Sequence, residues 1–122
     1  MFDHVGLNVR DFAASRDFYR RALEPLGWKE VMGFEEWKAA AFGFDDKPVF
    51  WISQREPYGT GTHIAFHADN HSTVHAFYAA AVAAGGTDNG PPGPRPQYTP
   101  TCYAAFVHDL DGNNVEAVCH TA

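Results

Sequence analysis

The stretch that decides the fold is Thr62-His63-Ile64-Ala65-Phe66, near the middle of the chain. It repeats the pattern of Asp3-His4-Val5-Gly6-Leu7, and the two histidines lie 59 residues apart. A chain of 122 residues with such a repeat contains two copies of one structural unit, each opening with a histidine on a strand-like run. The same spacing relates three further pairs of positions: Asp11 and Asn70, Phe18-Tyr19 and Phe77-Tyr78, and Gly27 and Gly86.

Composition limits the class of protein. A length of 122 residues fits one domain, and the 45% hydrophobic content is ample for a packed core. The net charge of −6 excludes a nucleic-acid surface, because phosphate binding needs clustered Lys and Arg. Two cysteines are too few for a disulfide framework. Without a leader or an apolar run near 18 residues, we expect a soluble, cytoplasmic protein that binds no membrane.

The first repeat unit, residues 1–56, has the pattern of a βαβββ module. Residues 2–9 are rich in β-forming side chains and predict a strand. Asp11 is suited to cap the helix that follows, and Pro25 and Gly27 end that helix. The remaining predicted elements are three short strands, over residues 29–34, 37–44 and 48–53.

The second unit, residues 61–122, follows a polar connection and predicts the same order of elements. Asn70 is the expected helix cap, and Asp111-Gly112 is the expected hairpin turn. Five prolines between residues 87 and 100 predict an irregular loop with at most a short edge strand. The other predicted elements are a strand over 62–68, a helix to about residue 84, and strands over 101–108 and 114–120.

Three residues are candidate metal ligands. His4 and His63 occupy equivalent places in the two units, so a pseudo-two-fold axis would bring them together. Glu116 lies among apolar residues of the last strand, where a lone carboxylate is costly unless it is paired or coordinated. Two imidazoles and one carboxylate suit a divalent ion such as iron(II), manganese, zinc or nickel, with positions left open for a substrate.

The two histidine strands, Phe18-Tyr19 and the closing Asp111-Gly112-Asn113-Asn114-Val115-Glu116 together resemble the vicinal oxygen chelate superfamily. Its members include glyoxalase I, extradiol dioxygenases, fosfomycin-resistance thiol transferases and bleomycin-resistance proteins. The resemblance covers the whole chain and implies an α+β fold, in which tandem βαβββ modules form a cupped mixed sheet with the helices outside. It also implies a homodimer with active sites near the subunit interface, where ligands from both subunits surround each metal.

The chain departs from the best-known member of that superfamily. Glyoxalase I has a further carboxylate ligand in the last strand of its first module, whereas Phe50 or Trp51 stands at that position here. Glyoxalase I activity is therefore not expected. Two histidines and one glutamate are closer to the dioxygenase and fosfomycin-enzyme sets, although Gly6 replaces the threonine of the fosfomycin enzymes.

Four further residues are candidates for the substrate pocket. His67 shares a strand face with His63, because side chains alternate along a strand. Trp51 and Tyr103 are core residues by default, but the resemblance allows them to line the cup. Tyr98, like Arg95 and Gln97, lies in the proline-rich loop, and loops beside a scaffolded site often carry specificity.

His71 and His75, spaced by one helical turn, are interpreted as a solvated helix face, and Cys102 and Cys119 as small buried side chains. Two functions then follow from the resemblance. The first is a divalent-metal enzyme whose ion chelates two oxygens of a small-molecule substrate, for lyase, isomerase, thiol-transferase or dioxygenase chemistry, with Glu116 as a possible base. The alternative is a metal-free, drug- or metabolite-sequestering protein of the bleomycin-resistance type, for which the net charge of −6 would suit a cationic ligand.

Overall fold

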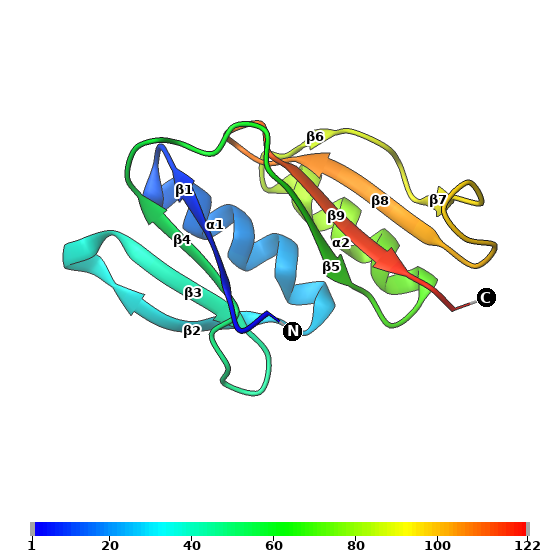
Figure 1. The fold of residues 1–122 in the computed structure, drawn as a ribbon, viewed down its shortest axis with the longest axis horizontal. Coiled ribbons are helices and arrows are strands. Elements are labelled where there is room, and N and C mark those ends of the chain that lie inside the picture. The colour runs from blue at the N-terminus through cyan, green and yellow to red at the C-terminus, as the bar shows by residue number, and fades with distance from the viewer. Residues whose placement is uncertain (1, 122) are drawn as a thin grey trace.

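Each half of the chain folds into a sheet and one long helix, as the repeat predicts. The computed structural model describes residues 2–121. In the first module β1 is parallel to β4, and the other neighbours are antiparallel, in the order β1-β4-β3-β2 (Figure 1). Its elements are β1 (Val5–Val9), α1 (Phe12–Leu23), β2 (Lys29–Phe34), β3 (Ala39–Gly43) and β4 (Phe50–Gln54).

The second module repeats this arrangement. β5 is parallel to β9, and the order is β5-β9-β8-β6, with β7 also pairing with β8. β6 and β7 have two residues each, because prolines interrupt the ladder between them. The elements are β5 (His63–His67), α2 (His71–Ala83), β6 (Thr87–Asp88), β7 (Gly93–Pro94), β8 (Tyr103–His108) and β9 (Asn114–Cys119). The predicted α+β fold class is confirmed.

The helices begin and end where the sequence predicts. The side chain of Asp11 accepts a hydrogen bond from the Ala14 N–H, and Asn70 accepts the equivalent bond from Thr73. After α1 the chain makes a short 3₁₀ helix, Glu24–Leu26, and leaves it through Gly27 at φ +83°. A left-handed residue at this place is typical of glycine, which has no Cβ to clash.

Four strands begin two or three residues later than predicted, those expected from residues 2, 37, 48 and 101. The strand expected over residues 37–44 begins only at Ala39, because Glu35–Trp37 forms a 3₁₀ turn that Lys38 ends at φ +48°. The strand expected from residue 2 begins at Val5, so His4 precedes β1 instead of lying within it. All four corrections concern strand ends, where the ladder partners that define a strand are missing.

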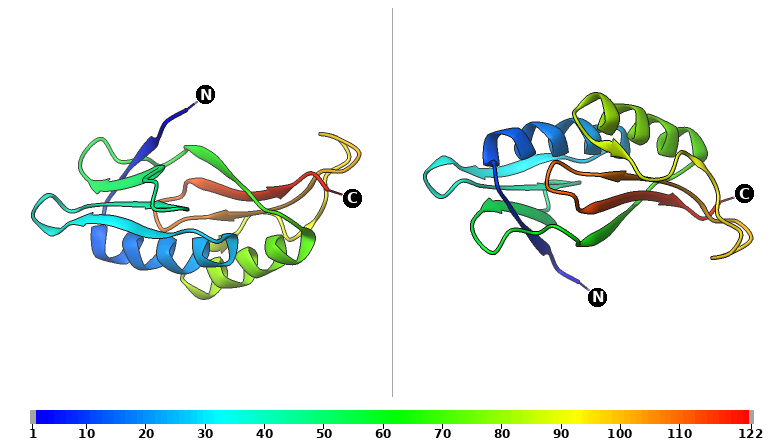
Figure 2. Two further views of the ribbon diagram at one scale, coloured as in Figure 1. Left: turned by 90° about the horizontal axis from the view of Figure 1, so that it is seen from below. Right: turned by 90° about the horizontal axis from the view of Figure 1, so that it is seen from above.

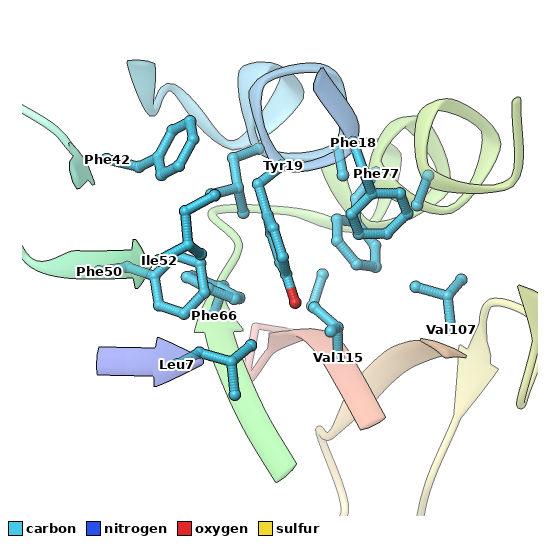
Figure 3. Packing of buried hydrophobic residues seen from close by; sticks show 14 of the residues in the cluster. Leu7, Phe18, Tyr19, Phe42, Phe50, Ile52, Phe66, Phe77, Val107 and Val115 are labelled. Carbon is cyan, nitrogen blue, oxygen red and sulfur yellow. The ribbon is translucent and has the colours of Figure 1, made fainter. Parts of the chain in front are cut away.

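Both helices cover the same side of the sheets, and the other side is free of helices (Figure 2). We call the helix-free side of each sheet its open face. α1 and α2 pack against each other, so the two modules share one apolar core. Phe18, Tyr19, Phe50 and Phe77 are among the fully buried side chains of that core (Figure 3).

The two sheets are separate within residues 2–121. β1 and β5 are edge strands, and neither is hydrogen-bonded to the other. The single cupped sheet that the resemblance implies is therefore present here as two sheets joined by their helices and by aromatic contacts. Trp28 and Phe50 each meet the Phe66 ring at a right angle, with centroids 5.1 and 5.4 Å apart.

A buried polar cluster links the modules through the β8–β9 turn. The Tyr19 hydroxyl of α1 donates to Asp109 Oδ2 at 2.5 Å, and the Asn113 amide also donates to Asp109. Asn113 further donates to the Gly59 carbonyl and accepts from the Thr62 N–H, so it holds the linker before β5. Burial, and then the Asp109 carboxylate, raise the pKa of Tyr19 well above its usual value, which keeps the hydroxyl protonated.

None of the helices in residues 2–121 is long and apolar enough to cross a membrane.

We expect Tyr19→Phe to lower the free energy of unfolding by about 2 kcal/mol, because a buried hydrogen bond to a carboxylate is lost. Urea denaturation followed by circular dichroism measures this. Tyr58→Phe is the matched control, since Tyr58 makes a cation–π contact with Arg10 and no hydrogen bond of its hydroxyl to residues 2–121. Equal stability of the two variants would contradict the role assigned to Tyr19.

Asp111 makes stability depend on pH. Its side chain is 4% exposed, and burial, followed by the nearby Asp109 charge, raises its pKa above the usual 3.8. A raised folded pKa means that the ionised form is disfavoured in the fold, so this group lowers stability as pH rises through that value. We therefore expect the stability of Asp111→Asn relative to the wild type to increase from pH 4 to pH 7 in urea titrations. The exposed Glu36→Gln should show no such trend.

Candidate functional site

The open face of the second sheet brings two predicted ligands together. Strand alternation and the pairing of Ala65 with Glu116 place His63, Ala65 and Glu116 on the same face. His63 Nε2 lies 2.8 Å from Glu116 Oε1, which is hydrogen-bond distance. His63 and Glu116 therefore form a pair across neighbouring parallel strands.

The two partners differ in exposure. The His63 side chain is 52% exposed, whereas that of Glu116 is 10% exposed. A buried carboxylate is costly without a partner, and the imidazole supplies one. The second carboxylate oxygen, Oε2, forms no hydrogen bond within residues 2–121, so one acceptor remains available beside an accessible imidazole.

A cavity of about 310 Å³ opens at this pair. Its walls are largely aromatic and apolar, and the His63 and Phe106 rings lie 6.3 Å apart. The cavity thus combines one carboxylate and one imidazole with an apolar surround, which is the usual composition of a small-molecule site. The lining residues are His63, Tyr98, Cys102, Phe106, Glu116, Val118 and His120.

The proline-rich loop that carries Tyr98 is held in place by Arg95. The Arg95 guanidinium donates to the carbonyls of Pro91 and Gly93, at 2.7 and 2.8 Å, and lies 5.4 Å from the centre of the Phe106 ring. Its backbone N–H donates to the Cys102 carbonyl. Tyr98 therefore forms part of the cavity wall. Arg95 stabilises the loop through its hydrogen bonds to the loop carbonyls.

Cys102 is a buried thiol in the same cavity. Burial, and then the Glu116 charge, raise the pKa of Cys102 above its usual value, and Arg95 partly opposes this shift. Cys119 is fully buried, and strand alternation directs it to the helix side of β9. The prediction of two buried cysteines is confirmed, and only Cys102 lines the site.

The third predicted ligand lies elsewhere. His4 is exposed at the start of β1, where its Nδ1 lies 2.8 Å from Asp3 Oδ1. Across residues 2–121, no three His, Cys, Asp or Glu side chains converge closely enough to hold a metal ion. A single chain therefore presents a pair of ligands, with His4 on the other sheet.

Two other residues predicted for the pocket, Trp51 and His67, line different cavities. Trp51 lies on the open face of the first sheet, next to Phe34, and lines a different cavity. His67 is exposed, lies 3.2 Å from Asp69, and borders a groove of about 470 Å³ that also contains His63. Both residues thus remain on open faces, but neither touches the His63–Glu116 pair.

Tyr103 is placed differently from the prediction. It lies three residues from Phe106 along β8, so alternation directs it to the opposite face, toward α2. There its ring stacks on His71 at 3.8 Å, and its hydroxyl lies 2.6 Å from His75 Nε2. Tyr103 is therefore no part of the cavity, and the two helix histidines, expected to be solvated, pack against it.

Sequence reasoning missed two polar lining residues, Cys102 and His120. Their signal was present, because residues 116, 118 and 120 alternate onto one face and the hairpin pairs Phe106 with Glu116. Applying that register to the whole hairpin would have selected both residues.

The geometry defines a class of protein: a two-module α+β domain with a carboxylate–imidazole pair in an open-faced cavity. The sequence matches the glyoxalase/bleomycin resistance protein/dioxygenase superfamily over residues 1–117. The chain belongs to this superfamily.

Solved structures agree with this assignment. A glyoxalase/bleomycin resistance protein from Albidiferax ferrireducens T118 is 30% identical, with 98% of each chain covered and a TM-score of 0.86. A glyoxalase/bleomycin resistance protein/dioxygenase family enzyme from Burkholderia phytofirmans PsJN is 19% identical, with 97% of each chain covered and a TM-score of 0.72. A glyoxalase I mutant from Zea mays is 24% identical, and the match covers 96% of this chain and 46% of that one, with a TM-score of 0.70. The last two likenesses concern the fold alone. No curated protein matches the sequence.

We expect Glu116→Gln to speed alkylation of Cys102 by iodoacetamide at least about twofold at pH 8, because removing the charge lowers the thiol pKa. Mass spectrometry of the peptides identifies the modified cysteine. The midpoint of the pH–rate profile should move to lower pH. Glu36→Gln, which removes an exposed charge elsewhere, should leave the profile unchanged.

Proposed function

We propose that the protein is a divalent-metal-dependent enzyme acting on a small molecule, with His63 and Glu116 of one chain and His4 of a second copy holding the ion. The main support for this proposal is the 2.8 Å contact between His63 Nε2 and Glu116 Oε1 at the mouth of a cavity. Imidazole and carboxylate are a common ligand pair for iron(II), manganese, zinc and nickel.

The donor set fits such an ion. His63 is half exposed, so its imidazole is accessible from the cavity, and Glu116 retains one oxygen without a partner in residues 2–121. His4 is exposed directly before β1 of the other sheet, and within residues 2–121 its side chain has only the neighbouring Asp3 as a partner. His63 and Glu116 lie together, whereas His4 lies apart beside the other sheet. This separation favours a site completed between two copies of the chain.

The free sheet edges support a dimer. β1 and β5 are both edge strands, and an unpaired edge is a natural surface for association. A groove of about 470 Å³ between them is lined by Phe2, Val5, Phe50, Ile64 and Phe66, among others. Burying this apolar surface in a homodimer would place the His4 strand of one chain close to the open face of the other.

The protein residues then have distinct tasks. A bound ion would supply Lewis acidity toward two oxygens of the substrate. His63 and Glu116 orient that centre, and the apolar wall around Phe106 and Val118 limits water near it. Glu116 is the candidate base for proton transfer, because its carboxylate faces the cavity. Lyase, isomerase, thiol-transferase and dioxygenase reactions all fit this arrangement, whereas the aromatic pair Phe50-Trp51 argues against glyoxalase I chemistry.

A metal-free binding protein of the bleomycin-resistance type is the second candidate. His63 and Glu116 satisfy each other without an ion, and the net charge of −6 would attract a cationic ligand. This protein would sequester a drug or metabolite in the groove between two copies.

Metal content separates these functions. We expect tag-free protein, incubated with iron(II), manganese, zinc or nickel, to bind about one ion per chain, and Glu116→Ala and His4→Ala to bind almost none. Elemental analysis after gel filtration measures this. Exposed Glu36→Gln is the matched control. Absence of uptake by the wild type for all four ions would leave the sequestering function.

Mixing the two deficient variants tests the shared site. In a heterodimer of His4→Ala and Glu116→Ala, one site loses both residues and the other keeps all three ligands. Random exchange should therefore restore about a quarter of the wild-type metal content. Ligands drawn from a single chain would give no restoration, and that result would contradict the two-chain arrangement.

A further inference from the structure

The open face of the first sheet carries a second cavity, of about 560 Å³, that the His63–Glu116 pair does not use. It lies where β4 continues into the linker, beside the 3₁₀ turn Glu35–Trp37. The residues that line it are Trp37, Ala39, Trp51, Ile52, Ser53, Gln54 and Arg55.

Three aromatic rings form a shelf at this cavity, which we define as Phe34, Trp37 and Trp51. The Phe34 and Trp51 rings are nearly parallel, with an interplanar angle of 8° and centroids 6.4 Å apart. The Phe34 and Trp37 rings lie 5.0 Å apart at 33°. Trp37 is 67% exposed, and an exposed cluster of large aromatic rings is typical of a binding surface.

The sheet leaves this shelf uncovered. Trp51 pairs with Gly6 on β1 and with Ala41 on β3. Glycine has no side chain and alanine has a single methyl group, so both neighbours on this face are small. A Cβ added at Gly6 would meet no atom within 4 Å. Since neither neighbour overhangs the indole, a planar molecule has room to lie against it.

The charged side chain that lines the cavity is that of Arg55, a cation. Arg55 is exposed and makes no ion pair with the described residues, whereas Arg10, Arg16, Arg20 and Arg21 each lie beside a carboxylate. No lining residue is acidic. An anion is thus favoured here, although the protein as a whole carries a charge of −6.

We propose that this cavity binds a small planar aromatic anion, with its ring on the aromatic shelf and its carboxylate or phosphate at Arg55. Aromatic stacking and a charge-assisted hydrogen bond to guanidinium are the two interactions that the lining offers. Binding itself needs no metal. His4 directly precedes β1, whose Gly6 pairs with Trp51, so the further statement that this molecule is the substrate rests on the proposed function.

The probe for the test is 2-naphthoate, with 2-naphthamide as its neutral isostere and 2-naphthylmethylammonium as its cationic one. Isothermal titration calorimetry of the 122-residue chain in EDTA measures the Kd without metal. We expect saturable binding of 2-naphthoate, weaker binding of the amide and the weakest binding of the cation. Added salt should weaken the naphthoate complex, because part of its affinity is an exposed charge interaction.

Two variants separate the ring from the charge. Trp37→Leu should raise the Kd for 2-naphthoate about fivefold, with Trp37→Phe intermediate. Arg55→Met should raise it about fivefold as well but leave the Kd for 2-naphthamide unchanged. Arg20→Met removes the same charge from the surface of α1 and should change neither Kd. Trp37 and Arg55 are exposed, so circular dichroism melts should show all variants folded.

Three results would overturn the proposal: no saturable binding of 2-naphthoate, tighter binding of the cationic probe, or an equal loss in Arg20→Met and Arg55→Met. The outcome is independent of the metal site. Naphthoate binding with the expected variant pattern in a protein that takes up no metal would uphold this cavity and refute the enzyme. Metal uptake without naphthoate binding would uphold the metal site and refute the proposed aromatic-anion cavity.

Discussion

The arrangement of the two modules depends on one buried carboxylate, that of Asp109. It accepts the Tyr19 hydroxyl from the first module and the Asn113 amide from its own turn, and Asn113 in turn holds the linker at Thr62. The Asn114 N–H then donates to the Thr62 carbonyl, which starts β5 in register with β9. Because buried polar groups are costly when unpaired, this network tolerates few alternative arrangements. The contact of His63 with Glu116 follows from that register.

The open faces follow from the way the core is built. α1 and α2 pack against each other and against one side of both sheets, so the strands direct core residues such as Phe42, Ile52 and Val115 to that side. The opposite side carries the residues with chemistry: the His63–Glu116 pair on the second sheet and the aromatic shelf with Arg55 on the first. The outer edges of β1 and β5 have no strand partner within residues 2–121. A second copy of the chain is the simplest way to cover them and to bring the two faces together.

Local signals in the sequence predicted much of this fold. The N-caps Asp11 and Asn70 act through bonds three residues away, and Gly27 and Gly112 adopt the positive φ that their turns require. The prediction was wrong where a boundary depends on distant partners, as at the start of β1, where Val5 is the first residue to pair with β4. Tyr103 is predicted in the pocket by residue type alone, whereas the hairpin register sets the sheet face on which its side chain lies. Alternation from Glu116 was sufficient to exclude it and to select Cys102 instead.

The sequence by itself determined the repeat, the order of the elements, the superfamily and two adjacent members of a candidate site, because these depend on residue type and short spacing. Tertiary structure alone decided which predicted residues meet. It paired His63 with Glu116, kept His4 on a separate sheet, turned Tyr103 toward α2, and left Arg55 without a carboxylate partner among residues 2–121. The physical reason is that register, helix packing and sheet edges are properties of segments far apart in the chain. Spacing along the sequence names the candidates, and packing selects among them.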